Sequence, residues 1–237
     1  ALTQVQLALD TTRRYQPAYL PRAQLREAQL WALLGQWGRV HQALQAVAPV
    51  LADAGWPPRL MHAVLQRQAA RVGLGQADAG WQAMAQLRDE IGPHIRPDLR
   101  LPLRIEMAAQ LPPEAAWDEL QAVAQEATRL GHRGSALAAW VRAAGLVDIG
   151  EMPARTAAEA ALALWQRGVR SVHLAPAEAW LHIGRGLQAA GDARHAALWR
   201  EGAAKLRRVA DEQVPEPFRD SFLRRQPVHE ALLRCAG

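Results

Sequence analysis

A short turn with a glycine near its centre recurs between pairs of alanine-rich, amphipathic segments. It occurs at residues 34–38, 74–78, 130–133 and 190–193. In each case one helical pattern runs up to the glycine and another begins just after it. A helix–turn–helix unit used repeatedly is the signature of a stacked-helix array, in which each repeat packs mainly on its neighbours. The chain is therefore predicted to be all-α, a solenoid of stacked antiparallel helix pairs.

Apolar residues spaced i, i+3, i+4 predict a helix in each segment between the proline and glycine breaks. No segment shows the period-2 alternation of a strand over more than a few residues. We expect residues 1–213 to form the array and residues 214–237 to form capping helices at its C-terminal end. The predicted helices cover residues 2–15, 21–34, 40–51, 60–72, 77–91, 96–110, 112–130, 134–147, 154–166, 177–190, 193–209, 218–225 and 227–234.

Nine tryptophans stand out in a chain with only two Phe and two Tyr. Trp37 and Trp56 lie just after a glycine at a turn or helix end, so we expect them to be partly exposed and to contribute to a contact surface. The others considered fall on apolar stripes and are predicted to lie in the core: Trp31, Trp140, Trp165, Trp180 and Trp199.

The net charge of +5 comes from 28 basic and 23 acidic residues, and Lys205 is the only lysine. Arginines and carboxylates are interleaved, as at residues 22–27 and 88–90, which is typical of solvated helix faces. The basic clustering that nucleic-acid contacts need is weak, so direct nucleic-acid binding is disfavoured.

The single cysteine, Cys235, excludes a disulfide within the chain and fits a reducing compartment, so we expect a cytoplasmic protein. No window approaches the ~18 uncharged apolar residues of a membrane span. The chain begins without a charged-then-apolar leader and without Met. The first feature predicts that no secretory signal is present, and the missing initiator Met suggests a fragment cut from a longer protein.

Residues 177–206 follow the tetratricopeptide pattern, in which small residues let two helices approach and large residues fill the gap beside them. The positions that carry the pattern are Trp180, Gly184, Leu187, Gly191, Ala196 and Ala203. The turn glycines Gly35, Gly75, Gly131 and Gly191 lie 40, 56 and 60 residues apart, whereas a regular array repeats at ~34. The chain thus resembles a degenerate tetratricopeptide-like array, which implies a right-handed solenoid.

In tetratricopeptide arrays the first helix of each pair lines a concave groove. The resemblance implies that polar residues on the face opposite the partner helix hold an extended peptide or a small effector. Together with the two partly exposed tryptophans, the predicted ligand- or partner-binding residues are Arg22, Gln29, Trp37, Trp56, His62, Asp118, Gln121, Gln125, Glu178, Arg185 and Gln188.

Residues 214–229, VPEPFRDSFLRRQPVH, are similar to the last segment of large bacterial ATPase-linked (STAND-type) transcriptional regulators. In that family the helical array often ends in VP…R-SFL-RNPV, and Gln226 stands here in place of the usual Asn. The resemblance implies a C-terminal sensor arm for signal transduction. An ATPase domain and a winged-helix or cyclase domain would then precede it in the full protein.

The sequence shows no arrangement for catalysis. A phosphate-binding GxxxxGK[ST] loop is absent, since Lys205 follows two alanines without the glycines. His229 and Glu230 precede Ala-Leu-Leu, so the second histidine of an HExxH zinc site is missing. His182 and His195 are interpreted as separate helix-surface histidines. We therefore expect no enzyme activity, no cofactor and no metal.

Three functions remain open at this stage. The first is a regulatory arm that senses a protein, a peptide or a small-molecule effector. The second is a free-standing adaptor or chaperone-like scaffold of the same fold. The third, motivated by the arginine content, is a nucleic-acid-binding helical repeat, whose binding would depend steeply on salt.

Overall fold

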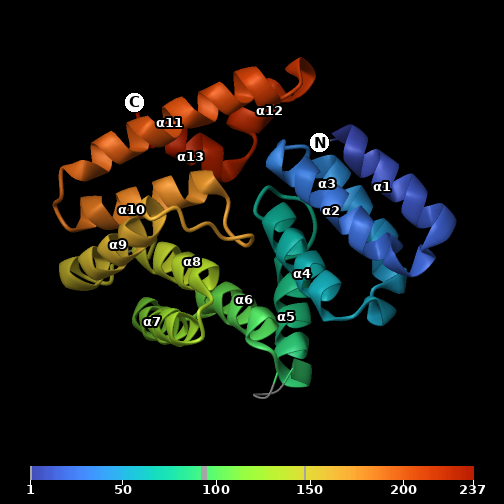
Figure 1. Cartoon of the computed structure of the whole chain (residues 1–237), viewed down its shortest axis with the longest axis horizontal. Helices are drawn as coiled ribbons and strands as arrows, with labels where there is room; N and C mark the ends of the chain where they lie inside the picture. The colour runs from blue at the N-terminus through green and yellow to red at the C-terminus, as the bar shows by residue number, and fades with distance from the viewer. Residues whose placement is uncertain (1, 92–94, 147) are drawn as a thin grey trace. The chain divides into compact units, whose positions relative to one another are not determined.

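The computed structural model describes residues 2–91, 95–146 and 148–237. Its secondary structure over these ranges is entirely helical, with thirteen α-helices, five 3₁₀ turns and no strand (Figure 1). The predicted all-α class is confirmed. Within the same ranges, no helix is both long enough and apolar enough to cross a membrane.

Each helix expected from the sequence is present, with its ends within about one turn of the predicted positions. The predicted last residue of one helix, Val147, lies outside the described residues. The α-helices are α1 (Leu2–Tyr15), α2 (Leu20–Leu33), α3 (Trp37–Val47), α4 (Trp56–Ala70), α5 (Ala77–Ile91), α6 (Pro97–Met107), α7 (Pro113–Arg129), α8 (Arg133–Ala144), α9 (Glu151–Gln166), α10 (Pro176–Ala189), α11 (Arg194–Gln213), α12 (Arg219–Arg224) and α13 (Pro227–Cys235). The 3₁₀ turns are η1 (Pro17–Tyr19), η2 (Ala48–Val50), η3 (Ala52–Ala54), η4 (Ala108–Gln110) and η5 (Glu216–Phe218).

Three of the predicted turns share one hydrogen-bonding pattern. Gly35, Gly131 and Gly191 have φ angles of 69°, 77° and 68°, a left-handed conformation that glycine adopts without steric penalty. At the first turn the Gly35 N–H donates to the carbonyl of Ala32 at 3.0 Å and the Gln36 N–H to that of Trp31 at 2.8 Å. These bonds form a Schellman motif, which satisfies the last carbonyls of a helix while the chain reverses.

The second turn differs from the expectation in detail. Its Schellman glycine is Gly73, whose N–H donates to Ala70 O at 3.0 Å, and not Gly75. A further motif of the same kind occurs at Gly168, with φ of 78°, after α9. The sequence pattern missed it because no helix begins just after this glycine, since α10 starts only at Pro176.

The chain divides into two compact units. Unit 1 contains residues 1–94 and 220–226, and unit 2 contains residues 95–219 and 227–237. The predicted capping segment, residues 214–237, is therefore shared between the units. The division of the chain after residue 213 stays a prediction.

Unit 1 is built from helix pairs that are adjacent in the sequence. Helix α1 packs on α2, α2 on α3 and α4 on α5, while α4 also contacts α2 and α3. Its core includes these side chains, each at most 4% exposed: Leu9, Leu25, Val40, Leu44, Ala63, Leu65, Met84 and Leu87.

Unit 2 surrounds α8. This helix contacts its sequence neighbours α7 and α9 and also α6 and α10, and α13 packs on α10 and α11. Helix α8 is buried on nearly every side, at Ser135, Ala136, Leu137, Ala138, Ala139, Val141, Ala143 and Ala144. The many alanines allow four other helices to approach its backbone closely, which is how protein interiors reach crystal-like packing density.

Glycine and tryptophan interlock in the pair α10–α11. A Cβ on Gly184 would lie 2.0 Å from Trp199 Nε1, and one on Gly202 would lie 2.6 Å from Trp180 Cγ. Each indole thus occupies the space that a side chain on the facing helix would need. The predicted close approach of the two helices at Trp180 and Gly184 is confirmed. Gly202 of α11 also contributes to it, because it leaves room for the Trp180 indole.

The tryptophans predicted for the core are at least partly buried. Trp31, Trp180 and Trp199 are 9%, 7% and 5% exposed. Trp140 and Trp165 are half-buried and pack against the core of unit 2, where the Trp165 ring meets the Trp180 ring edge-on at 5.4 Å between centroids.

We predict opposite effects for two Gly→Ala substitutions in helices. Gly184→Ala should destabilise the protein by about 1–3 kcal/mol, because the new Cβ overlaps the Trp199 indole and the pair must separate. Gly38→Ala has no atom within 4 Å of the new Cβ and should stabilise α3 by about 0.5 kcal/mol. Urea unfolding followed by circular dichroism measures both, and equal effects would contradict the interlock.

Candidate interaction sites

A polar groove runs along the pair α2–α3 in unit 1. It is shallow and open to solvent, with a volume of about 400 Å³. Its lining residues are Gln24, Glu27, Trp31, Arg39, Gln42, Ala43 and Ala46.

Each wall of the groove is one stripe of a helix. Gln24, Glu27 and Trp31 are spaced i, i+3, i+7 on α2, and Arg39 and Ala46 have the same span on α3, so each set lies on one helix face. Seven residues of helix rise about 10 Å, which matches about three residues of extended chain. The groove is thus long enough for a short stretch of peptide.

An arginine of the α3 wall stacks on an aromatic ring of the α2 wall. The Arg39 guanidinium lies 4.3 Å from the centroid of the Trp31 ring, a cation–π arrangement. Ala43 and Ala46 leave room above α3 because their side chains end at Cβ. Sequence analysis missed Gln24, Glu27, Arg39 and Gln42. The spacing of Gln24 and Glu27 from Trp31 on α2 was a usable signal, whereas Arg39 and Gln42 lie on the next helix, α3.

The expected exposure of Trp37 is wrong. Its side chain is 7% exposed, and its indole Nε1 donates to the carbonyl of Arg225 at 2.7 Å. The reason is that segment 220–226 of unit 1 covers the start of α3. This segment lies 188 residues further along the chain, so no local pattern could reveal it.

His62 is also buried, at 7% exposed, and does not lie on an open polar face. Its Nε2 is 3.2 Å from the carbonyl of Leu44, and because a carbonyl only accepts, Nε2 carries the proton. His62 lines a small cavity of about 100 Å³ with His41, Gln45 and Gln66. Burial lowers the pKa of His62 below its usual 6.5, partly offset by the bond to Leu44.

The other predicted residues of unit 1 are accessible. Arg22 is exposed, with its guanidinium 5.9 Å from the ring centroid of Tyr19. Gln29 is half-buried and accepts a hydrogen bond from Arg26 Nη1 at 2.8 Å. Trp56, the first residue of α4, is half-buried, which agrees with the expected partial exposure. None of the three lines the α2–α3 groove.

The predicted residues of unit 2 come from two helices that are not packed on each other. Asp118, Gln121 and Gln125 lie on α7, whereas Glu178, Arg185 and Gln188 lie on α10. Helix α10 packs on α8, α9, α11 and α13, and α7 packs on α6 and α8. Asp118, Gln125 and Gln188 are exposed, and Gln121 and Arg185 are half-buried.

Glu178 belongs to a buried ion cluster and not to an open face. Arg142 Nη2 of α8 donates to Glu178 Oε1 of α10 at 2.9 Å and to Glu106 Oε1 of α6 at 3.1 Å. The side chains of Glu106 and Glu178 are 8% and 11% exposed. Burial alone would lower the pKa of Arg142, but the two carboxylates raise it overall, so the guanidinium stays charged. The cluster therefore joins α8 to α6 and α10, the two contacting helices that are not its neighbours in the sequence.

A second set of ion pairs joins α6 to α7. Arg104 Nε and Nη2 bind the two carboxylate oxygens of Glu119 at 2.6 and 3.0 Å, and its Nη1 binds Glu126 at 2.7 Å. Arg100 also pairs with Glu126. Hydrogen bonding to Glu119 raises the pKa of Arg104. The basic residues of α6 are thus engaged within the unit.

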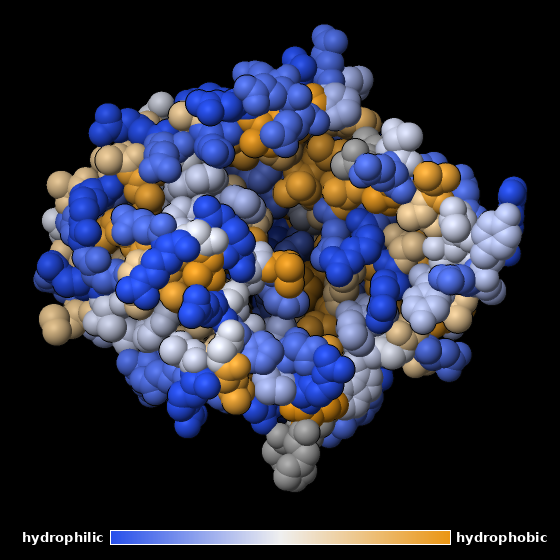
Figure 2. Space-filling model, viewed as in Figure 1, coloured by the Kyte–Doolittle hydropathy of each residue, from blue (hydrophilic) through white to orange (hydrophobic). Residues whose placement is uncertain are grey.

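Exposed charges of both signs lie on α11. On the face shown in Figure 2, hydrophilic residues cover most of the outer side of this helix. Its exposed charged residues are Arg194, Arg200, Glu201, Lys205, Arg207, Arg208, Asp211 and Glu212. This surface has mixed charge, as the interleaved sequence predicts.

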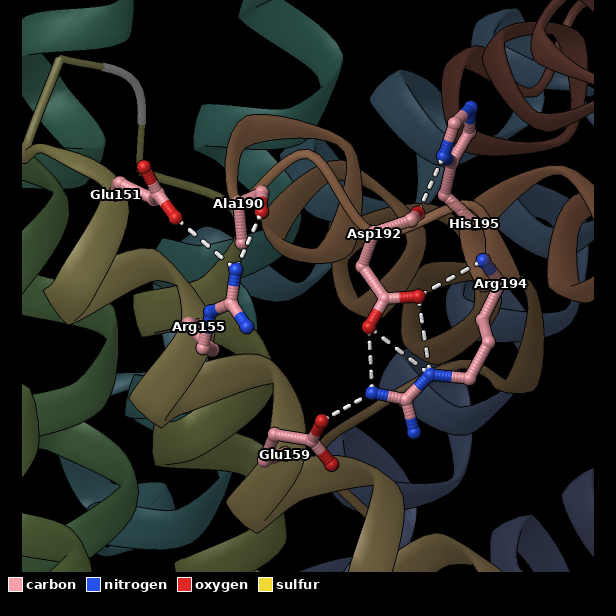
Figure 3. A network of polar contacts seen from close by, with 7 residues as sticks. All are labelled: Glu151, Arg155, Glu159, Ala190, Asp192, Arg194 and His195. Atoms are coloured by element: carbon pink, nitrogen blue, oxygen red, sulfur yellow. Dashed lines mark hydrogen bonds and ion pairs between the residues drawn. The ribbon is translucent and has the colours of Figure 1, made fainter.

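Arginines and carboxylates also join α9 to the turn between α10 and α11 (Figure 3). Arg194 Nε and Nη2 contact the Asp192 carboxylate at 2.6–3.0 Å, and Arg194 also pairs with Glu159 of α9. Asp192 Oδ1 accepts the backbone N–H of Arg194 at 2.9 Å. The bonds from Arg194 lower the pKa of Asp192 to about 2.

The carbonyl just before a turn glycine is capped by a distant side chain in two of the Schellman turns. Arg155 Nη2 of α9 donates to Ala190 O at 2.8 Å, as drawn in Figure 3. Ser221 Oγ donates to Leu34 O at 2.7 Å. These carbonyls have no partner in their own helix, so each turn presents an acceptor that another element can recognise.

Ser221 is held from two sides. Its hydroxyl donates to Leu34 O and accepts from Gln36 Nε2, both at 2.7 Å. It is 6% exposed, and Phe222 beside it is 3% exposed. Residues 220–226, here called the tail segment, are therefore held at the α2–α3 turn by Ser221.

In the described part of the chain, no three His, Cys, Asp or Glu side chains are grouped so as to hold a metal ion. Cys235 is a half-buried free thiol at the end of α13. The expected absence of catalysis stays a prediction.

A scan against protein-family models, a search of curated proteins and a search of solved structures each find no match for this chain. The likenesses to tetratricopeptide arrays and to ATPase-linked regulators rest on the residues quoted above, and the family stays a prediction.

We predict a pH dependence from His62. A buried histidine whose pKa lies below 6.5 binds a proton more readily in the unfolded chain, so stability falls as the pH drops through and below 6.5. His62→Gln keeps an N–H donor for Leu44 O and cannot titrate. Urea unfolding between pH 7.5 and 5.5 should show the wild type losing stability relative to the variant, and parallel curves would contradict this.

We predict that the ionisation of Asp192 also makes stability fall as the pH drops, but at lower pH than for His62. Its pKa is 3.8 when unperturbed and about 2 in the fold, so its stabilising effect is present above about pH 4 and is lost as the pH falls toward 2. In thermal unfolding, Asp192→Asn should melt below the wild type at pH 7, and the difference should shrink over this range. Glu201→Gln, an exposed change on α11, is the control. A difference that stays constant with pH would contradict the prediction.

Proposed function

We propose that this chain is a non-catalytic protein-interaction domain whose α2–α3 groove binds an extended segment of a partner protein. The observation that carries the proposal is the groove itself, with two glutamines and an Arg39–Trp31 stack in an open trough of about 400 Å³. Its length suits about three extended residues.

The lining chemistry favours a peptide over an apolar ligand. The side-chain amides of Gln24 and Gln42 each donate and accept hydrogen bonds, as does a peptide backbone. Glu27 and Arg39 stand on opposite walls and offer opposite charges to the side chains of a bound segment. Deep apolar pockets, which most small-molecule sites use, do not contribute to this groove.

We further propose that the fold is a degenerate, right-handed tetratricopeptide-like solenoid. The shared Schellman turns, the α6–α8–α10 contacts and the glycine–tryptophan interlock of α10–α11 support it. Each feature is what a stack of helix pairs requires, since neighbouring pairs bury each other's apolar faces.

In the cell, we propose that the domain serves as the cytoplasmic sensor arm of a bacterial ATPase-linked transcriptional regulator. Residues 214–229 support this role through their likeness to the end of such regulators. The effector would be a protein, a peptide or a small molecule, and the ATPase and DNA-binding domains would belong to the full protein. A free-standing adaptor would use the same groove.

The groove is tested with a phage-displayed peptide library, selected on the immobilised chain. Arg39→Ala should weaken binding of the selected peptides about tenfold, because it removes both a charge and the stack on Trp31. Arg13→Ala, an exposed change on α1 in the same unit, is the matched control and should leave binding unchanged. Selected peptides that bind both variants as tightly as the wild type would overturn the groove assignment.

A further inference from the structure

The tail segment and the α2–α3 turn cap each other's helices. Ser221, at the start of α12, donates to Leu34 O at the C-terminal end of α2. Trp37, at the start of α3, donates to Arg225 O at the C-terminal end of α12. Both carbonyls lie at helix C-termini, where no partner within the helix exists. Side chains from two distant segments thus satisfy two helix ends reciprocally.

The turn is shaped to receive the segment. A Cβ on Gly35 would lie 2.3 Å from Ser221 O and 3.0 Å from Arg225 Cβ, so only glycine lets the two backbones meet. Gly131 and Gly191 have the same left-handed backbone, yet a Cβ on either would meet no atom within 4 Å. Close approach is therefore a property of the Gly35 turn and not of the Schellman motif.

The contacts are those of a small, specific peptide complex. Three hydrogen bonds of 2.7 Å connect Leu34, Gln36 and Trp37 to Ser221 and Arg225. Within the segment, Arg224 and Arg225 are exposed and Phe222 is buried. The residues on either side, Arg219 and Pro227, belong to unit 2, so the docked part is short.

We propose that the α2–α3 turn is a peptide-binding site for helical Ser-Phe-Leu-Arg-Arg segments, and that residues 220–226 are its resident, exchangeable ligand. The site requires a hydroxyl that both donates and accepts, and a free carbonyl four residues later for the Trp37 indole. The segment is supplied by the same chain, as it is in this structure. This site is separate from the groove, and its test does not depend on the groove.

The experiment uses the full chain and a fluorescent peptide of residues 216–229. In the wild type the site is filled by its own segment, which competes at the high effective concentration of a tethered ligand. Ser221→Ala removes two hydrogen bonds from the resident segment and leaves the receptor intact. This variant should bind the peptide at least about tenfold tighter than the wild type does.

Three controls accompany the titration. A peptide with Ala in place of Ser221 should bind the Ser221→Ala chain about tenfold more weakly than the natural peptide. The Gly35→Ala chain should bind neither peptide, because the new Cβ occupies the place of Ser221 O. Gly191→Ala, made in the Ser221→Ala chain, introduces the same backbone strain without touching the segment and should leave peptide binding unchanged.

Mixing two variants identifies the source of the segment. The Ser221→Ala chain keeps a good receptor, and the Gly35→Ala chain keeps a good segment. A one-to-one complex in light scattering, absent for either variant alone, would show that a second copy supplies the segment and would overturn the same-chain assignment. Peptide binding without such a complex assigns the segment to the same chain.

A folded Ser221→Ala chain that binds no peptide, or that binds both peptides equally, overturns the proposal. If the Ser221→Ala chain does not fold, amide hydrogen exchange of the wild type tests whether the segment is released. Amides of residues 222–225 should exchange at least about tenfold faster than those of residues 28–32 in α2, through local release of the segment. If the amides of residues 222–225 and of residues 28–32 exchange only through global unfolding, the segment is a fixed part of the core, and the proposal is overturned.

Discussion

The left-handed glycine at the end of a helix is the constraint on which the rest of this structure depends. At Gly35, Gly73, Gly131, Gly168 and Gly191 it allows the chain to leave a helix while its last carbonyls stay hydrogen-bonded. At all five of these turns the next helix then packs on the one before it. Each turn also leaves one carbonyl available, and Ser221 and Arg155 cap two of them from distant parts of the chain.

Small residues convert these turns into close helix pairs. Alanines let α8 contact four other helices, and Gly184 and Gly202 admit the indoles of Trp199 and Trp180. Where alanines line a partly exposed wall, as Ala43 and Ala46 do, the same small size leaves a groove. Small side chains thus explain both the close packing of the helices in the core and the groove at the surface.

In unit 2, partly buried ion pairs join helices to one another. Arg142 joins α8 to α6 and α10 through Glu106 and Glu178, and Arg104 joins α6 to α7. A net charge of +5 could suggest a surface that binds a polyanion. The arginines in these pairs are bound to carboxylates of the same unit and do not form such a surface. Arg39 lies over the Trp31 ring at the α2–α3 groove, which is why we propose it as a recognition residue.

The sequence by itself determined the helices, the turns at Gly35, Gly131 and Gly191, and the close pair at Trp180 and Gly184, because helix periodicity and glycine turns are local properties. The tertiary structure alone decided that Trp37, His62 and Glu178 are buried and that Gln24, Glu27, Arg39 and Gln42 line a groove. It also decided that Ser221 meets Leu34, 187 residues away. A polar helix face stays exposed only if no other element packs against it. Such packing depends on contacts between distant segments, which no local sequence pattern encodes.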